Sequence, residues 1–116
     1  MPKDDLVYIG HMLDTACKVA EKVQGIRRTD FDKDENLRIA LAHLIQVIGE
    51  AARHVSPAFR DAHPEVPWQA IVGMRHKVVH DYMNVDENVV WKTATKEITE
   101  LISHLAPLVP PQEGAV

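Results

Sequence analysis

The stretch MRHKVVHDYMNVD, from Met74 to Asp86, carries side chains that could act in catalysis or hold a metal ion. Arg75 has a permanent charge and a planar set of donors that matches phosphate oxygens. His80 titrates near neutral pH and can exchange protons. His76 and His80 are four residues apart, so on a helix they would share one face and could chelate a metal. The stretch therefore permits three interpretations: a solvated helix end, a metal site or a catalytic site.

The metal interpretation lacks a complete ligand set. In the zinc metalloprotease motif a glutamate directly follows the first histidine. Here Lys77, a cation that would repel a metal, follows His76. Asp81 or Glu50 could approach as a third ligand, although the spacing of neither residue requires it. We therefore expect no metal site in this chain and no cofactor of its own.

Structural roles are open for several of these residues. Lys77 and Asp81 are also four residues apart and could form a solvated ion pair that supports a helix. Arg75 could make a surface ion pair, and Tyr82 suits the edge of a core. With about 100° per residue, Arg75 and His80 lie about 140° apart on an ideal helix, whereas Arg75 and Tyr82 lie nearly on one line. Arg75 and His80 could therefore flank one cleft or act jointly with a second subunit.

Composition restricts the classes of protein to which these residues can belong. The chain has 116 residues, 46% of them hydrophobic and 26% charged, which suits one globular domain. No apolar run approaches the roughly 18 residues of a membrane span, and the first residues do not resemble a signal peptide. Cys17 is the single cysteine, so we expect a cytoplasmic protein without an intrachain disulfide. The net charge of −4 argues against non-specific binding of duplex DNA but permits a local cleft for a short RNA.

The elements that must position the motif are predicted to be helical. Apolar residues recur every three or four positions almost throughout, and no segment alternates as a half-buried strand does. Gly49 and Ala51 are small enough for close helix–helix approach, and Ser56 followed by Pro57 indicates a short helix. The fold class is all-α: an antiparallel bundle of four main helices plus a short helix. We expect the domain to cover about 1–108, with a flexible tail over 109–116, and the main helices to lie at about 3–24, 33–54, 67–82 and from Asp86 to Pro107.

The sequence around the motif resembles the HepT-type toxins of the HEPN superfamily. Their pattern is an arginine, four residues, a histidine, one residue and a tyrosine, which here corresponds to Arg75, His80 and Tyr82. His76 stands where the family commonly has asparagine; it is polar, and we do not interpret it as disabling. The resemblance spans about 1–108. Three further segments fit at the expected distances: IQVIGEAARHVSP (45–57), HPEVPWQAIVGMR (63–75) and VDENVVW (85–91).

That resemblance implies a homodimer in which two arginine–histidine motifs face one another across a shared cleft. It also implies metal-independent cleavage of tRNA or mRNA with Arg75 and His80 as catalytic residues. The implied chemistry is reasonable, because RNA carries its own nucleophile in the 2′-hydroxyl. One histidine per subunit gives the dimer one possible acid and one possible base. The resemblance suggests supporting roles for His76 and for Glu50, which could orient Arg75 or His76.

The resemblance further implies a regulator. Such toxins are paired with a small, MntA-like nucleotidyltransferase antitoxin that uses ATP and Mg²⁺ to transfer AMP to the motif tyrosine, here Tyr82. Together they form a prokaryotic toxin–antitoxin system of the type VII kind, without a role for a membrane. Two alternatives remain. One is a non-catalytic HEPN module that binds nucleotide or RNA beside the nucleotidyltransferase, and the other is a plain helical dimerisation domain.

Overall fold

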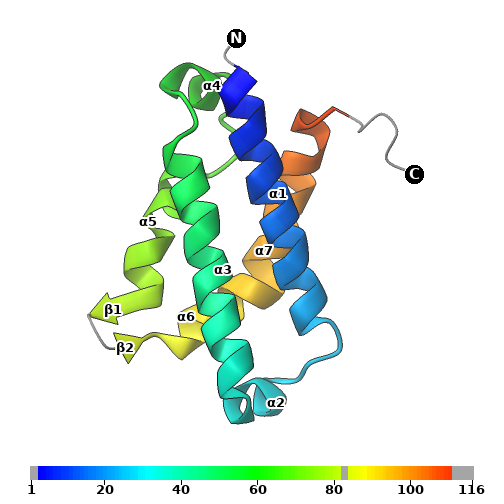
Figure 1. Ribbon diagram of the computed structural model, residues 1–116, viewed down its shortest axis with the longest axis vertical. Helices are drawn as coiled ribbons and strands as arrows, with labels where there is room; N and C mark the ends of the chain where they lie inside the picture. Colours follow the sequence, from blue (N-terminus) through cyan, green and yellow to red (C-terminus); the bar gives the residue numbers. More distant parts are fainter. Residues whose placement is uncertain (1–2, 82–83, 111–116) are drawn as a thin grey trace.

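The computed structural model describes the backbone of residues 3–81 and 84–110, and the side chains of these residues except Lys3, 75–81 and 84–85. The fold is all-α and compact, with four main helices, two short ones and one small hairpin (Figure 1). In chain order the elements are α1 (Lys3–Val23), α2 (Arg28–Lys33), α3 (Glu35–Arg53), α4 (Pro57–Ala62), α5 (Trp68–Val78), β1 (Val79–Asp81), β2 (Asn84–Val85), α6 (Glu87–Lys92), the π-helical η1 (Thr93–Glu97), α7 (Ile98–Leu105) and the 3₁₀ turn η2 (Ala106–Leu108).

The long helices lie side by side and alternate in direction. The α3 helix packs between α1 and α5, and α7 packs on α1. Figure 1 shows α1, α3 and α5 running down, up and down, while α6, η1 and α7 form one continuous helical path behind them. The predicted antiparallel bundle is therefore confirmed for a single chain. The predicted dimer is a separate matter that a single chain does not test.

The core follows the predicted helical spacing. From α1, Ile9 and Ala16 have fully buried side chains, and from α3 Ile45 and Ile48 are fully buried as well. Burying one aliphatic side chain of this size contributes roughly 1.5–3 kcal/mol. Further fully or almost fully buried members from other positions are Met12, Val19, Leu41, Ala52, Val55, Ile71, Val90, Ile98 and Leu105. The core thus connects all four long helical segments.

The helix α2 lies between the helices predicted over 3–24 and 33–54, where no helix was predicted. Phe31 is fully buried and its ring lies 5.0 Å from that of Trp91. The Asp30 carboxylate accepts a hydrogen bond from the backbone N–H of Arg27 at 3.0 Å, and this bond lowers the pKa of Asp30. Asp34 caps α3 by accepting from the Leu37 N–H at 3.0 Å. One buried aromatic side chain is enough to turn a charged stretch into a docked helical turn.

The short helix α4 is fixed by a buried carboxylate. Ser56 caps α4, because its Oγ accepts from the Phe59 N–H at 3.2 Å. Asp5, which is only 2% exposed, accepts from the Ser56 N–H at 2.8 Å and from the Ser56 hydroxyl at 2.7 Å. Each oxygen of the buried Asp5 carboxylate thus accepts a hydrogen bond, and the two bonds connect the start of α1 to the segment between α3 and α5.

The predicted helix over 67–82 is too long at its C-terminal end. The α5 helix ends at Val78, and β1 then pairs antiparallel with β2, with Val79 opposite Val85. The β-branched Val79 is compatible with this extended backbone, which its pairing with Val85 stabilises. The expectation that no strand occurs is therefore wrong at this point. The predicted common helical faces of His76 with His80 and of Lys77 with Asp81 are therefore wrong, because His80 and Asp81 lie on β1. The predicted alignment of Arg75 with Tyr82 involves a residue outside the described part of the chain.

The C-terminal end agrees with the predicted stop. After α7 the chain makes η2, which contains Pro107, and the partly buried side chain of Val109 still packs against the core. The predicted flexible tail over 109–116 lies, apart from its first two residues, outside the described residues. Among the helices over 3–81 and 84–110, none is both long enough and apolar enough to cross a membrane.

Candidate functional site

The helix that carries the first half of the motif is held in place by α3. A Cβ at position 49 would lie 3.0 Å from the carbonyl oxygen of Ile71, which is tighter than ordinary van der Waals contact. Glycine at this position therefore lets the backbones of α3 and α5 approach closely, as the sequence predicted for Gly49. Ile71 and Met74 are both buried, so α5 is fixed up to the residue before Arg75.

The start of α6, which follows the hairpin, is held by contacts with α2 and with the N-terminal part of α3. Asp86 caps α6 by accepting from the Val89 N–H at 3.2 Å, as predicted. The Arg28 guanidinium donates to the side-chain oxygen of Asn88 at 2.8 Å. Arg38 forms an ion pair with Glu87 at 3.2 Å, and its side chain is only 21% exposed. The hairpin of β1 and β2 is thus a short excursion between two anchored helix ends.

Three of the predicted site residues fall on this anchored unit. Arg75 and His76 lie in the last turns of α5, and His80 lies on β1, two residues after the helix ends. The side chains of these three residues, and Tyr82 altogether, lie outside the part of the chain that the structure describes. The backbone brings Arg75 and His80 to one end of α5, and their catalytic roles stay predictions.

Glu50 has described contacts of a different kind. Its carboxylate lies 3.2 Å from the Arg53 guanidinium and 3.6 Å from Nε2 of His54, all on the exposed side of α3. The ring of His54 stacks on that of Tyr8, with centroids 5.1 Å apart. Because α3 and α5 are antiparallel and Gly49 lies beside Ile71, Glu50 is roughly level with residue 70, about 7 Å along the axis from Arg75 at 1.5 Å per residue. The predicted supporting role of Glu50 stays a prediction.

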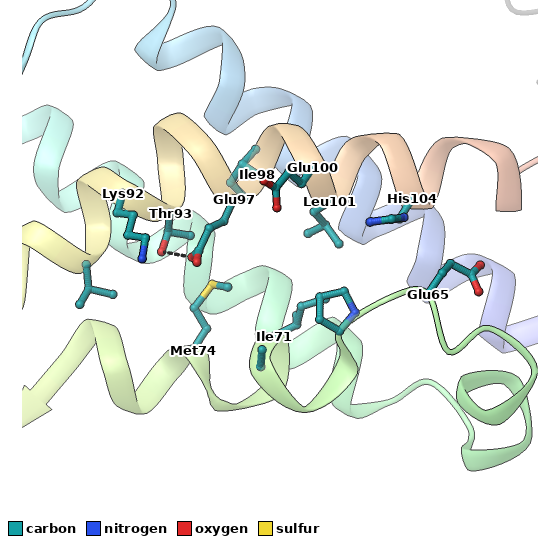
Figure 2. Close-up of a pocket in the computed structure, with 13 residues that line it drawn as sticks. Glu65, Ile71, Met74, Lys92, Thr93, Glu97, Ile98, Glu100, Leu101 and His104 are labelled. Carbon is teal, nitrogen blue, oxygen red and sulfur yellow. Dashed lines mark hydrogen bonds between the residues drawn. The ribbon is translucent and has the colours of Figure 1, made fainter.

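A cavity that the sequence analysis missed lies on the other side of α5. It has a volume of about 490 Å³ and opens between α5 and the path of α6, η1 and α7. In Figure 2, Ile71 and Met74 of α5 face Thr93, Glu97 and Leu101 of the opposite wall. Its lining residues are Glu65, Pro67, Ala70, Ile71, Met74, Val89, Lys92, Thr93, Glu97, Ile98, Glu100, Leu101 and His104. We refer to it as the α5–α7 groove.

Part of the groove wall is the π-helical segment η1. Both of its ends line the groove, and the Thr93 hydroxyl donates to the Glu97 carboxylate at 3.1 Å. Thr93 is 1% exposed, whereas Glu97 is exposed. Insertions of this kind interrupt an α-helix at a cost and are frequent at functional sites. No sequence signal would have found the groove, because its residues lie up to about forty positions apart.

No group of three or more potential metal ligands occurs where side chains are described. That statement does not reach His76 and His80, whose side chains are outside the described part. The absence of a metal site therefore stays a prediction for the motif itself, and it needs an experiment.

Comparison with known proteins identifies the family. Residues 12–108 match the family model described as "Ribonuclease HepT-like". The chain belongs to the HepT-like ribonuclease family. The matched span begins within α1 and ends with η2, so it includes the motif, the hairpin and both walls of the groove. The resemblance inferred from Arg75, His80 and the flanking segments is confirmed.

Individual relatives of this HepT-like chain bear names of the same kind. "Putative RNase TTE0752" of Caldanaerobacter subterraneus subsp. tengcongensis is 40% identical over 81% of this chain and 84% of its own length. "Probable ribonuclease HepT" of Thermococcus cleftensis is 32% identical over 81% of this chain and 86% of its own length. "Putative RNase MJ1380" of Methanocaldococcus jannaschii is 28% identical over 85% and 91%. No solved structure gives a significant match to the chain.

Proposed function

We propose that this HepT-like protein is an endoribonuclease that cleaves RNA without a metal ion. The observation that carries the proposal is the family match over 12–108, which includes Arg75 and His80 on adjoining elements at one end of α5. The 2′-hydroxyl of RNA attacks the neighbouring phosphorus, and the bond from phosphorus to the 5′-oxygen breaks. The products are a 2′,3′-cyclic phosphate and a free 5′-hydroxyl, so the step needs no external nucleophile.

The motif residues divide this work between them. Arg75 stabilises the additional negative charge on the phosphorane oxygens, as planar charged donors do. His80 exchanges protons with the attacking or the leaving oxygen. One catalytic histidine per chain cannot be acid and base in the same step, so we propose a homodimer in which two copies of His80 supply the two roles.

The test is cleavage of a defined RNA by the purified chain in the presence of EDTA. We expect full activity, and we expect Arg75→Ala to lose it, since loss of one charge-stabilising donor costs about 10²–10³-fold. Arg27→Ala is the matched control, because Arg27 is an exposed arginine that pairs with Asp30, outside the motif. Activity that disappears in EDTA and returns only with a divalent ion would contradict the metal-free mechanism. No cleavage by the wild-type dimer would favour the non-catalytic alternative.

The proposal extends to control by a nucleotidyltransferase antitoxin. The Tyr82 oxygen attacks the α-phosphorus of ATP, pyrophosphate leaves, and the hydroxyl proton passes to a base of that partner, which also holds Mg²⁺. The product, a tyrosine ester of AMP, places an anionic nucleotide two residues from His80. Such a group repels RNA phosphate and occupies the space near the motif.

The matched pair for this part is Tyr82→Phe and Tyr8→Phe, which remove the hydroxyl from the two tyrosines of the chain. We expect the Tyr82→Phe protein to keep RNA cleavage and to escape silencing by the partner with ATP and Mg²⁺. The Tyr8→Phe protein should be silenced like the wild type. AMP located by mass spectrometry on a peptide without Tyr82 would contradict the proposed acceptor.

A further inference from the structure

The α5–α7 groove is unsuited to the substrate of a ribonuclease. Its floor is apolar, with Ile71, Met74 and Leu101 buried. Its charged lining residues comprise three glutamates against one lysine, with His104 as the further titratable group. Carboxylates at this density repel RNA phosphates, whereas they attract lysine or arginine side chains. The chemistry of the groove therefore fits a protein segment that presents apolar and basic side chains.

The groove is also lined by the two helices that flank the hairpin in the sequence. Ile71 and Met74 belong to α5, which leads into β1, and Val89 and Lys92 belong to α6, which follows β2. A protein seated in the groove would contact both helices that carry the hairpin. An enzyme that modifies Tyr82 must contact the chain near that residue, and α5 and α6, which precede and follow the hairpin in the sequence, both contribute residues to the groove.

We propose that the α5–α7 groove is the docking site for the regulator, which inserts a segment with apolar and lysine or arginine side chains. The inference rests on the proposed function for the identity of the occupant, a nucleotidyltransferase that modifies Tyr82. Glu65, Glu97 and Glu100 attract the basic side chains, and the buried floor accepts the apolar ones. Docking and RNA cleavage then use different surfaces of one chain, so they can be separated by substitution.

Glu100→Lys is the sharpest variant. Glu100 is exposed on α7, so reversing its charge leaves the core unchanged. The matched control is Glu21→Lys, an exposed glutamate on α1 that does not line the groove. A second variant, Ala70→Phe, fills the groove from an exposed position and keeps every charge. The rate of AMP transfer is measured by intact mass at fixed nucleotidyltransferase, ATP and Mg²⁺, over a range of concentrations of this chain.

We expect Glu100→Lys and Ala70→Phe to raise the half-saturating concentration of the chain about tenfold, with the maximal rate and RNA cleavage unchanged. Glu21→Lys should behave as the wild type. Equal half-saturating concentrations for the wild type and both groove variants would overturn the docking site. Light scattering that shows a dimer for the wild type and a monomer for Ala70→Phe would assign the groove to a second copy and would also overturn it.

If the proposed function is wrong, the measurements of AMP transfer give a result that differs from a failure of the docking site. If the wild-type chain takes up no AMP, the proposed modification of Tyr82 is wrong, whatever the groove does. Binding of the nucleotidyltransferase to the chain without ATP then decides docking by itself. A dissociation constant about tenfold weaker for Glu100→Lys supports the groove, and an unchanged constant rejects it.

Discussion

The helix α5 meets the rest of the molecule in two different ways. On the side of α3 the contact is so close that a Cβ at position 49 would lie 3.0 Å from the backbone of Ile71. On the side of α7 the same helix leaves a groove of about 490 Å³. The close side fixes the axis of α5 and thereby the start of the motif. The open side keeps apolar surface and carboxylates accessible next to the same motif.

This difference indicates a division of labour around the motif. A helix packed tightly on both sides would position Arg75 equally well but would offer no surface beside it. The groove contributes little to holding α5, yet it keeps Met74 and Leu101, two side chains of its floor, at the edge of an open cavity. Apolar side chains at the floor of an open cavity with polar groups at its rim are typical of binding sites. The comparison predicts that substitutions on the two sides affect different measurements.

The largest expected effect is on RNA cleavage. It comes from His80, just beyond the C-terminal end of α5, and from neither the side that faces α3 nor the side that faces α7. His80→Ala should reduce RNA cleavage by about 10²–10⁴-fold, the usual contribution of one proton-transfer side chain. His104→Ala is the control, because His104 lines the open side and has no role in the proposed reaction. Both proteins should remain folded by circular dichroism. An equal loss of cleavage in both variants would place the reaction in the groove and would remove the distinction between the two sides.

The next largest expected effect is on the free energy of unfolding, and it tests the close contact between α3 and α5. Gly49→Ala and Gly10→Ala each replace a glycine within a long helix, so each gains about 1 kcal/mol of helix propensity. A Cβ at position 10 meets no atom within 4 Å, whereas a Cβ at position 49 would lie 3.0 Å from the Ile71 carbonyl oxygen, so the backbone there would have to shift by a few tenths of an ångström. Urea denaturation should therefore show Gly49→Ala less stable than Gly10→Ala by about 1–3 kcal/mol. Equal stabilities would mean that the seam between α3 and α5 yields easily.

The fold could be predicted from the sequence wherever the spacing of apolar residues is regular. The helices predicted over 3–24 and 33–54 are observed as Lys3–Val23 and Glu35–Arg53, because a long amphipathic stripe overrides local preferences. The helix α2 escaped prediction, since its only deeply buried side chain is Phe31 within a charged stretch. A single aromatic has no period, and its docking against Trp91 depends on a residue sixty positions away.

The residue types of the site could be predicted from the sequence, but its geometry could not. The composition of 74–86 and its resemblance to HepT-type sequences identified the family, yet the helical spacing assumed for the motif was wrong. Two valines in succession allowed either a further helical turn or a strand, and only pairing of Val79 with Val85 decides between them. The groove was inaccessible, because its walls come from segments that share no local pattern.

The smallest effect is expected within α5 itself. Gly73 lies one residue before Met74, and a Cβ there meets no atom within 4 Å. Gly73→Ala should therefore raise the free energy of unfolding, measured in urea, by up to about 1 kcal/mol, because alanine restricts the unfolded chain and favours the helix. RNA cleavage should not change if no second molecule approaches α5 at this point. Cleavage that falls while stability rises would show that a second subunit or the RNA packs closely against Gly73. The helix α5 would then make two close contacts: one with α3 at Gly49, and one with another molecule at Gly73.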